Sequence, residues 1–404
     1  MAARFMMIVG VLVAGLALTF CGCKKGGEQP PVKKPDEKPA VTAPSDANPI
    51  KIGAIFAETG GAINLGLPEA RTAKLFVDKL NQSGGLLGRK VELIVKDSGS
   101  TPANAISLAK QLIEEQKVLA IIGPSTSGET MAIKSICQEN KTILLSCAAA
   151  ETIVDPIASY VFKTPQKDSD AVRYIYKTLK DLGLTKVGVI YSTDGFGNAG
   201  KDQLNKLAGE SGITIAIAEG YGTSETDLTA ILTKLKGQDI QAVINWSIVS
   251  AQSLVAKNMK QIGLSVPLFQ SHGYGNIKYV EAGGEAANGT IFPCGRLLVA
   301  DVLPADHPQK ALLVQYKTDY ETLYKENAST FGGHAYDALL ILTEAVKKAG
   351  STDSEKVREA IENLKGVVGT AGIFNFSATD HNGLALEAFE MLTVKDGKFA
   401  IYAK

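Results

Sequence analysis

Residues 118–140, VLAIIGPSTSGETMAIKSICQEN, contain a short apolar run, a turn rich in hydroxyl side chains and a helical pattern. The apolar run 118–122 is typical of a strand, and Gly123 and Pro124 end it. Thr126, followed three residues later by Glu129, forms a capping-box pattern that predicts the start of a helix. The stretch is therefore predicted to be a strand, a turn and a helix, which is the repeating unit of an α/β fold.

The turn at 125–128 is suited to hold an anion. The backbone N–H groups of Ser127 and Gly128 are expected to face outward at the positive end of a helix dipole, next to the hydroxyls of Ser125 and Ser127. Ser and Thr are also the usual helix caps. Capping alone is therefore the alternative explanation for these hydroxyls.

The same unit repeats along the chain. Before the turn, strands are expected at 50–56 and 91–97 and helices at 70–82 and 104–116, and another strand is expected after it at 143–146. A second set has helices at 168–182, 200–210, 228–236 and 250–262, and strands at 187–191, 213–219, 242–246 and 267–270. An irregular Gly-rich stretch, 283–295, precedes helices at 308–326, 335–348 and 354–363 and two final β-type segments, 372–376 and 387–402. This order predicts two doubly wound, Rossmann-like α/β lobes with a cleft where the carboxyl ends of strands meet helix N-termini.

Composition excludes several classes of protein. The 404 residues include 42 basic and 42 acidic side chains, and because they are interspersed we expect no nucleic-acid partner. Cys137, Cys147 and Cys294 lack the spacing of a disulfide scaffold or a zinc site, although a single disulfide stays open. No metal and no cofactor is expected. The globular part, about 355 residues, exceeds one typical core and so predicts two domains.

The first 23 residues are typical of a lipoprotein signal peptide. Arg4 precedes the apolar run 5–20 and the sequence Cys21-Gly22-Cys23, a run too short and wrongly flanked for a membrane helix. Gly22 makes Cys23 the better candidate for lipid attachment, with Cys21 as the alternative. Residues 24–48, rich in Pro, Lys and Glu, are expected to be an extended tether. We therefore expect an extracytoplasmic protein, in the periplasm or at the cell surface, with a lipid anchor in the membrane; a cleaved soluble form is the alternative.

From residue 50 onward the chain resembles the type I periplasmic substrate-binding proteins of the branched-chain amino acid ABC transporter family. The motifs that carry the resemblance are KIG at 51–53, TG at 59–60, NQSGGLLGR at 81–89, VKD at 95–97, IGP at 122–124, YVFKT at 160–164, YSTDGFG at 191–197 and AYDA at 335–338. The resemblance implies three crossings between the lobes, placed near Thr164, Cys294 and Gly369. The first lobe would comprise 49–164 and 296–368, and the second 165–295 and 369–404.

The resemblance also implies what the protein does. It would be a monomeric binder, not an enzyme, that closes on a small-molecule ligand and delivers it to ABC permease subunits. Ser127 would hold a ligand carboxylate, and the backbone at Ala148 and Ala150 would add contacts. Ala150 replaces a threonine that is common in the family, so one hydroxyl is absent.

Two second-lobe positions depart from the family. Phe196 replaces the tyrosine that closes over the ligand, and His272 replaces the acidic residue that binds the ligand ammonium. A histidine is a poor ammonium partner and suits a carbonyl, a hydroxyl or a second carboxylate. Trp246 is expected either to line the same side or to pack in the core, while Leu65 would add apolar surface. The ligand is thus an acid, either an amino acid or a related organic or aromatic acid.

Three other interpretations stay open. The same fold could serve as a sensing module that signals to a kinase. Residues 195–200, GFGNAG, match the GxGxxG pattern of an NAD-binding dehydrogenase, but three residues separate the strand from the first glycine. A serine hydrolase could use Ser125 or Ser127, but the turn does not match the GxSxG pattern.

His334 is expected to be a buried or capping residue.

Overall fold

The computed structural model describes residues 45–403, which form one compact unit. The expected signal peptide, Cys23 and most of the expected tether lie outside the described residues. The last tether positions belong to a strand instead, because β1 spans Ser45–Phe56 and Ser45 pairs with Arg89. Arg89 Nε also donates a hydrogen bond to the Asn48 carbonyl at 2.9 Å.

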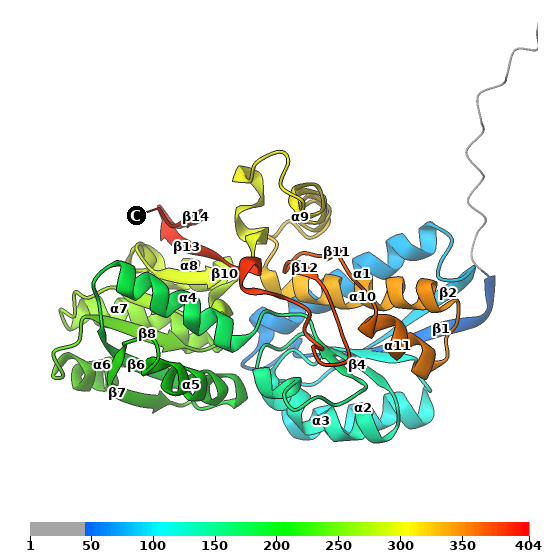
Figure 1. Cartoon of the computed structure of the whole chain (residues 1–404), viewed down its shortest axis with the longest axis horizontal. Coiled ribbons are helices and arrows are strands. Elements are labelled where there is room, and N and C mark those ends of the chain that lie inside the picture. Colours follow the sequence, from blue (N-terminus) through cyan, green and yellow to red (C-terminus); the bar gives the residue numbers. More distant parts are fainter. Residues whose placement is uncertain (1–44, 404) are drawn as a thin grey trace, which may run out of the picture. The chain divides into compact units, whose positions relative to one another are not determined.

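The first lobe is built on a five-stranded parallel sheet in the order β2-β1-β3-β4-β5. Its other strands are β2 (Arg89–Asp97), β3 (Ala120–Ile122), β4 (Ile143–Ser146) and β5 (Val161–Lys163). One face packs against α1 (Ile63–Gln82), α10 (Thr330–Ala349) and α11 (Ser354–Glu362), and the other against α2 (Pro102–Lys110) and α3 (Ser127–Glu139) (Figure 1). A π-helical turn, Gln111–Glu115, continues α2.

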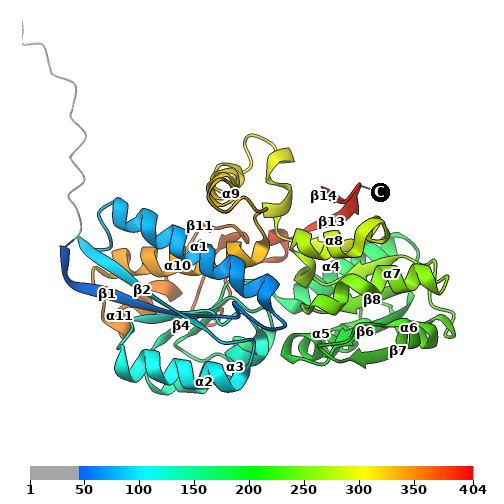
Figure 2. The same ribbon diagram turned by 180° about the vertical axis from the view of Figure 1, so that it is seen from behind.

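The second lobe has a seven-stranded sheet in the order β14-β13-β10-β9-β8-β6-β7. Five strands are parallel: β6 (Lys186–Ser192), β7 (Thr214–Tyr221), β8 (Ala242–Trp246), β9 (Leu268–Gln270) and β10 (Ile291–Cys294). The strands β13 (Glu390–Lys395) and β14 (Lys398–Ile401) are antiparallel additions at one edge. One face packs against α4 (Asp168–Asp181) and α5 (Gly195–Ala208), and the other against α6 (Thr229–Lys236) and α7 (Leu254–Gln261) (Figure 2).

The remaining elements connect or extend these layers. The helix α8 (Ile277–Gly283) precedes β10, and α9 (Lys310–Tyr324) packs with the 3₁₀ segment Arg296–Val302 in a small apolar cluster of its own. The short strands β11 (Val367–Val368) and β12 (Ile373–Phe374) pair with each other. None of the helices in the described part of the chain is both long enough and apolar enough to cross a membrane.

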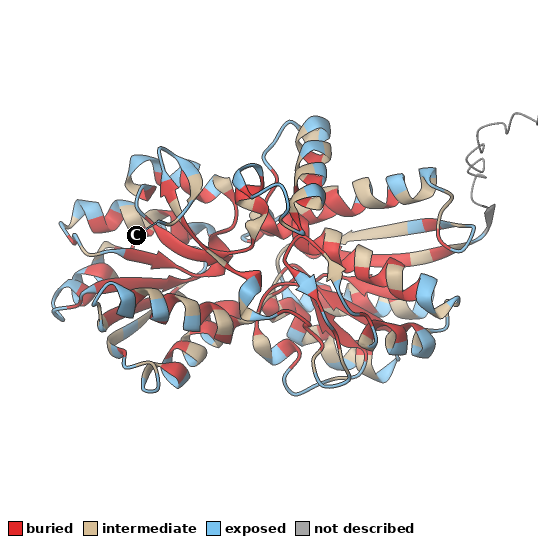
Figure 3. Ribbon diagram, turned by 45° about the horizontal axis from the view of Figure 1, so that its top comes forward, coloured by how far each residue is buried: buried red, intermediate tan, exposed pale blue. Residues whose placement is uncertain are grey.

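Two doubly wound lobes were predicted, and both are present. Burial follows the sheets: their inner strands are buried, whereas the edge strands β2, β7 and β14 and the outer faces of the helices are partly or fully exposed (Figure 3). The strand β10 was missed, since it lies within the stretch expected to be irregular. It contains Pro293, and proline is rare inside sheets because it lacks a backbone N–H.

The third crossing differs from the expected position near Gly369. Phe374, Phe376 and Leu384 lie in the apolar core of the first lobe, whereas Phe389 and Met391 lie in that of the second. The chain therefore crosses just before Phe389, about twenty residues later than expected. Residues 369–388, which were assigned to the second lobe, contribute their buried apolar side chains to the core of the first lobe.

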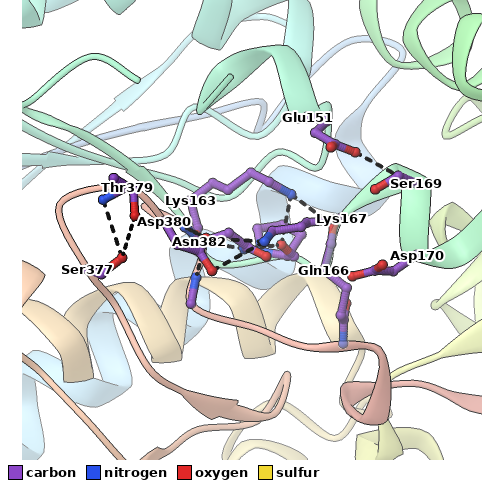
Figure 4. Close-up of polar contacts among 12 residues, drawn as sticks. Glu151, Lys163, Gln166, Lys167, Ser169, Asp170, Ser377, Thr379, Asp380 and Asn382 are labelled. Atoms are coloured by element: carbon purple, nitrogen blue, oxygen red, sulfur yellow. Dashed lines mark hydrogen bonds and ion pairs between the residues drawn. The ribbon is translucent and has the colours of Figure 1, made fainter. Parts of the chain in front are cut away.

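The first crossing joins β5 to α4 and is held by a buried lysine (Figure 4). The Lys163 ammonium donates hydrogen bonds to the carbonyls of Ala149, Pro165 and Gln166 at 2.8, 3.0 and 2.9 Å. Asn382 Nδ2, from the segment that leads to the third crossing, donates to the Pro165 carbonyl at 2.7 Å. Two crossings are thus fixed to each other by buried polar groups that satisfy the carbonyls of an irregular segment.

Candidate ligand-binding site

A small cavity lies where the carboxyl ends of strands from both sheets converge. The first lobe contributes Leu65, Ser125, Ser127, Cys147, Ala148, Ala149, Phe331 and His334, the second contributes Phe196, Ile248, His272 and Gly273, and the first crossing contributes Pro165. Its volume of about 20 Å³ is room for roughly one water, whereas sites for small organic ligands measure about 300 Å³ or more. The cavity in this arrangement of the lobes is therefore too small for a ligand of amino-acid size.

A second, larger depression of about 660 Å³ lies at the opposite end of the first sheet. It is open, and its walls include Lys51, Lys117 and Lys141. Ligand sites in open α/β sheets form at the carboxyl ends of strands, so the smaller cavity between the lobes is the candidate site.

The turn before α3 has the predicted capping box. The Thr126 hydroxyl accepts from the Glu129 N–H, and the Glu129 carboxylate accepts from the Thr126 N–H at 3.2 Å. Ser127 is then the first residue of the helix, is 2% exposed and lines the cavity. The Gly128 amide, which was expected to face outward, lies close to Gly195 of the second lobe, since a Cβ built on Gly195 would be only 2.8 Å from Gly128 N.

The two serines of the turn have different partners. The Ser125 hydroxyl accepts from the Ala57 N–H at 3.0 Å and also bonds the buried carboxyl of Glu69, so it links the turn to β1 and α1. Burial, with the charge of Glu129 nearby, raises the pKa of Glu69 well above its usual range. The Ser127 hydroxyl accepts only from the Ala150 N–H at 3.2 Å among the bonds of the described chain, so its own proton is available for a ligand.

The turn after β4 lines the cavity at Ala148 and Ala149, while Ala150 does not line it. The backbone at Ala148 and Ala150 was expected to contact the ligand, and its N–H groups have partners within the protein. Ala148 donates to Ser146 Oγ at 3.1 Å, and Ala150 donates to Ser127 Oγ. The Ala149 carbonyl accepts from Lys163, which connects this turn directly to the first crossing.

His272 is enclosed by aromatic rings at the end of β9. The centroids of Phe196, Trp246 and Phe389 lie 5.4, 5.5 and 5.7 Å from its own, each in an edge-to-face arrangement. Phe196 and His272 line the cavity, whereas Trp246 does not line it and is fully buried. Of the two roles considered for Trp246, the structure places it in the core.

An acidic group does lie near His272, but behind the cavity wall. Asp168, at the start of α4, is fully buried and its Oδ1 is 3.4 Å from His272 Nε2. Neither carboxyl oxygen has a hydrogen-bond partner in the described chain. Burial raises the pKa of Asp168 to about 8 and lowers the pKa of Lys163 to about 8, with each group opposing the other's shift.

His334 was expected to be a buried or capping residue, and it is buried, but it also lines the cavity. Ser329 caps α10 by accepting from the Gly332 N–H, which places Phe331 and His334 in the first turns of the helix, at the cleft. The signal that could have identified them is the Ser-Thr start of this helix, since helix N-termini converge on the cleft in such folds.

The structure also accounts for the glycines that resemble a dinucleotide motif. The N–H groups of Phe196 and Gly197 donate to Asp194 Oδ1 at 2.8 and 2.9 Å, so they are already occupied by a helix cap. A Cβ on Gly200 would lie 2.0 Å from Trp246 Nε1. These residues are explained by helix capping and close packing, and the dehydrogenase interpretation has no remaining support in them.

The contacts among the described residues support neither a catalytic serine nor a metal site. Ser125 and Ser127 have the partners given above, and no hydrogen bond joins either of them to a histidine in residues 45–403. Within the same range no group of three His, Cys, Asp or Glu side chains is placed to hold a metal. Cys137, Cys147 and Cys294 are buried free thiols.

The comparisons with known proteins agree with this architecture. Residues 49–398 match the family model described as periplasmic binding protein. Leu/Ile/Val-binding protein homolog 3 of Brucella melitensis is 25% identical over 357 residues, which cover 86% of this chain and 92% of the relative. The leucine-, isoleucine-, valine-, threonine- and alanine-binding protein of Pseudomonas aeruginosa is 24% identical over 320 residues, covering 78% and 82%.

Solved structures show the same fold. An extracellular ligand-binding receptor from Rhodopseudomonas palustris superposes with a TM-score of 0.82 at 25% identity, covering 88% of this chain and 99% of that one. The branched-chain amino acid transporter substrate binding protein LivJ from Streptococcus pneumoniae, solved in complex with isoleucine, gives 0.76 at 25% identity, covering 87% and 98%. The chain therefore belongs to the periplasmic binding protein family, as a type I member of the branched-chain amino acid group.

Proposed function

We propose that the protein is the extracytoplasmic solute-binding component of an ABC importer and captures a small carboxylate-bearing solute by lobe closure. The observation that carries the proposal is the cavity lined by both lobes, with the free hydroxyl proton of Ser127 at the N-terminus of α3. That position combines a hydrogen-bond donor with the positive end of a helix dipole, which favours a carboxylate.

Contacts across the cleft support lobe closure as the capture step. Asn276 Nδ2, in the second lobe, donates to the Asn64 carbonyl of the first at 2.8 Å. Gly195 lies against Gly128. A ligand that touches both walls stabilises this arrangement over one with separated lobes, because only its differential contacts can shift the equilibrium.

The importer role is supported by the names of the relatives, which include a substrate binding protein of a branched-chain amino acid transporter. Its partners would be the permease subunits, and Cys23 would carry the lipid that keeps the monomer at the membrane. In cells that carry the gene, we expect its deletion to abolish uptake of the labelled solute. Undiminished uptake together with loss of a transcriptional response to the solute would instead identify a sensing module.

Ser127→Ala tests the carboxylate site. Thermal-shift and calorimetric titrations of the full chain in detergent, against amino acids, aromatic acids and short-chain acids, first identify the acids that bind. Ser127→Ala should then weaken them by about 1.5–3 kcal/mol, the range for hydrogen bonds to charged groups. The matched control is Ser107→Ala, which removes an exposed hydroxyl of α2. Equal affinity in the parent and Ser127→Ala would contradict the assignment.

A further inference from the structure

Two histidines from opposite lobes line the cavity, and both are short of hydrogen-bond partners. His272 is 7% exposed and His334 is 6% exposed. In the described chain the Nδ1 atoms of His272 and His334 have no hydrogen-bond partner, whereas Nε2 of His272 lies 3.4 Å from Asp168 Oδ1, behind the wall. Buried polar atoms are almost always hydrogen-bonded, and leaving them unpaired is unfavourable. Unpaired nitrogens on the wall of a ligand cavity therefore point to groups of the ligand itself.

The charged groups near these rings are committed elsewhere or lie behind the wall. Lys163 gives its three protons to backbone carbonyls, as described above, and Asp168 does not line the cavity. Glu151, which also faces this region, accepts from the Ser169 N–H at 3.1 Å. No Asp, Glu, Lys or Arg is among the residues that line the cavity.

Both imidazoles are neutral at physiological pH. Burial, followed by the charge of Lys163, lowers the pKa of His334 to about 3 and the pKa of His272 well below its usual range. A neutral imidazole offers one donor and one acceptor, whereas an ammonium group carries three donors and needs acceptors for each. The wall is thus suited to a second polar group that is uncharged.

The rest of the wall suits hydrocarbon. Leu65, Ile248 and Phe331 line the cavity together with Phe196. They provide apolar surface in the same cavity as the hydroxyl of Ser127 and the two histidines, and such a surface favours a compact aliphatic or aromatic skeleton.

We propose that the ligand is a carboxylic acid with a second, uncharged hydroxyl or carbonyl group, which His272 and His334 hold between the two lobes. The proposal rests on the proposed function, in which Ser127 holds the carboxylate. The proposed ligand differs from an amino acid in one property: its second polar group is neutral, whereas that of an amino acid is an ammonium. Asp168 then serves as a neighbour that positions His272 and does not contact the ligand.

Matched ligands test the proposal on the full chain. The aliphatic series is 4-methylpentanoate, its 2-hydroxy and 2-oxo derivatives, and leucine, which share one skeleton and differ at one group. The aromatic pair is benzoate and 4-hydroxybenzoate. We expect a hydroxy or oxo acid to bind at least about tenfold more tightly than the plain acid of its series and than leucine, because a site built to hydrogen-bond a hydroxyl discriminates strongly against analogues that lack it.

Substitution of the histidines separates a direct contact from a structural role. In His272→Phe and in His334→Phe the preference for the hydroxy or oxo acid over the plain acid should fall to within about twofold. His272→Gln and His334→Gln, which retain hydrogen-bonding atoms, should keep part of it. His307→Phe is the matched control, since His307 lies outside the cavity and is partly exposed. A general packing defect would weaken all acids equally and would leave the preference intact.

The outcomes distinguish this proposal from the proposed function. If acids bind but leucine or the plain acid binds as tightly as the hydroxy and oxo acids, the histidine proposal is wrong while acid capture stands. If the preference exists but survives both Phe variants, the histidines are not its source and the proposal is again overturned. If no acid binds, both proposals fail.

Discussion

Gly195→Ala should weaken ligand binding without weakening the fold of either lobe. Gly195 is the first residue of α5 in the second lobe and lies against the turn of the first lobe that contains Ser127. A Cβ at this position would be 2.8 Å from Gly128 N and 2.9 Å from Gly128 Cα. Both atoms belong to the backbone and cannot swing aside, so the added methyl group obstructs only the arrangement in which the lobes meet.

The magnitude follows from the geometry. The 2.8 Å approach is about 0.6 Å short of the 3.4 Å at which ordinary contacts begin. Overpacking of this kind costs about 1–3 kcal/mol, which corresponds to a loss of affinity of roughly 5- to 150-fold. Within its own lobe the change is harmless, because alanine is up to about 1 kcal/mol better than glycine in a helix.

The assay is calorimetric titration of the parent and the variant with whichever acid binds best, together with thermal unfolding of both proteins without ligand. Gly209→Ala is the matched control, because it makes the same change at the other end of α5 and no atom lies within 4 Å of the added Cβ. If Gly195→Ala binds within twofold of the parent, the contact with Gly128 does not form in the ligand-bound state and the closure argument fails.

Three further predictions concern the fold, the buried histidine and the anchor. Gly200→Ala should lower the free energy of unfolding by at least about 1–3 kcal/mol, seen in thermal unfolding, because its Cβ would meet Trp246 Nε1 inside one lobe. Burial lowers the pKa of His334 from the ordinary value of 6.5 to about 3. Between these two pH values the unfolded chain binds a proton at this histidine and the folded chain does not. The free energy of unfolding therefore falls as the pH falls. From pH 7 to pH 5 the parent should lose about 2 kcal/mol relative to His334→Gln in urea unfolding, and parallel pH profiles would contradict the neutral buried ring. Cys23→Ala should abolish incorporation of labelled palmitate and Cys21→Ala should not; the reverse result would move the anchor to Cys21.

The parts of the site that could be predicted from the sequence are those that depend on local chain structure. The capping box places Ser127 at a helix start, and the two residues that form it, Thr126 and Glu129, are close neighbours in the sequence. Phe196 likewise lies in the first turn of α5, a few residues after β6 ends, so its place at the cleft follows from the strand, turn and helix order. Local patterns fix such positions because capping and turn chemistry act over a few residues.

Features that depend on long-range packing were not predictable in this way. His334 reaches the cavity only because α10 returns to the first lobe, about 170 residues after β5 leaves it. The third crossing was placed near Gly369 on the resemblance alone, yet Phe374 and Phe376, which follow it, fill the core of the first lobe and their rings stack at 5.6 Å. Hydrophobicity marks such residues as buried but does not say in which lobe.

The first crossing and the wall of the cavity share one buried charge. Lys163 bonds the carbonyl of Ala149, which lines the cavity, and two carbonyls of the first crossing, and its charge also helps to keep His272 and His334 neutral. The geometry of the crossing and the protonation of the wall therefore depend on the same ammonium group. A mutation of Lys163 cannot alter lobe movement alone, because the wall would also lose the charge that opposes protonation of its histidines. In this chain the charge that holds the crossing also helps to keep the histidines of the cavity wall uncharged.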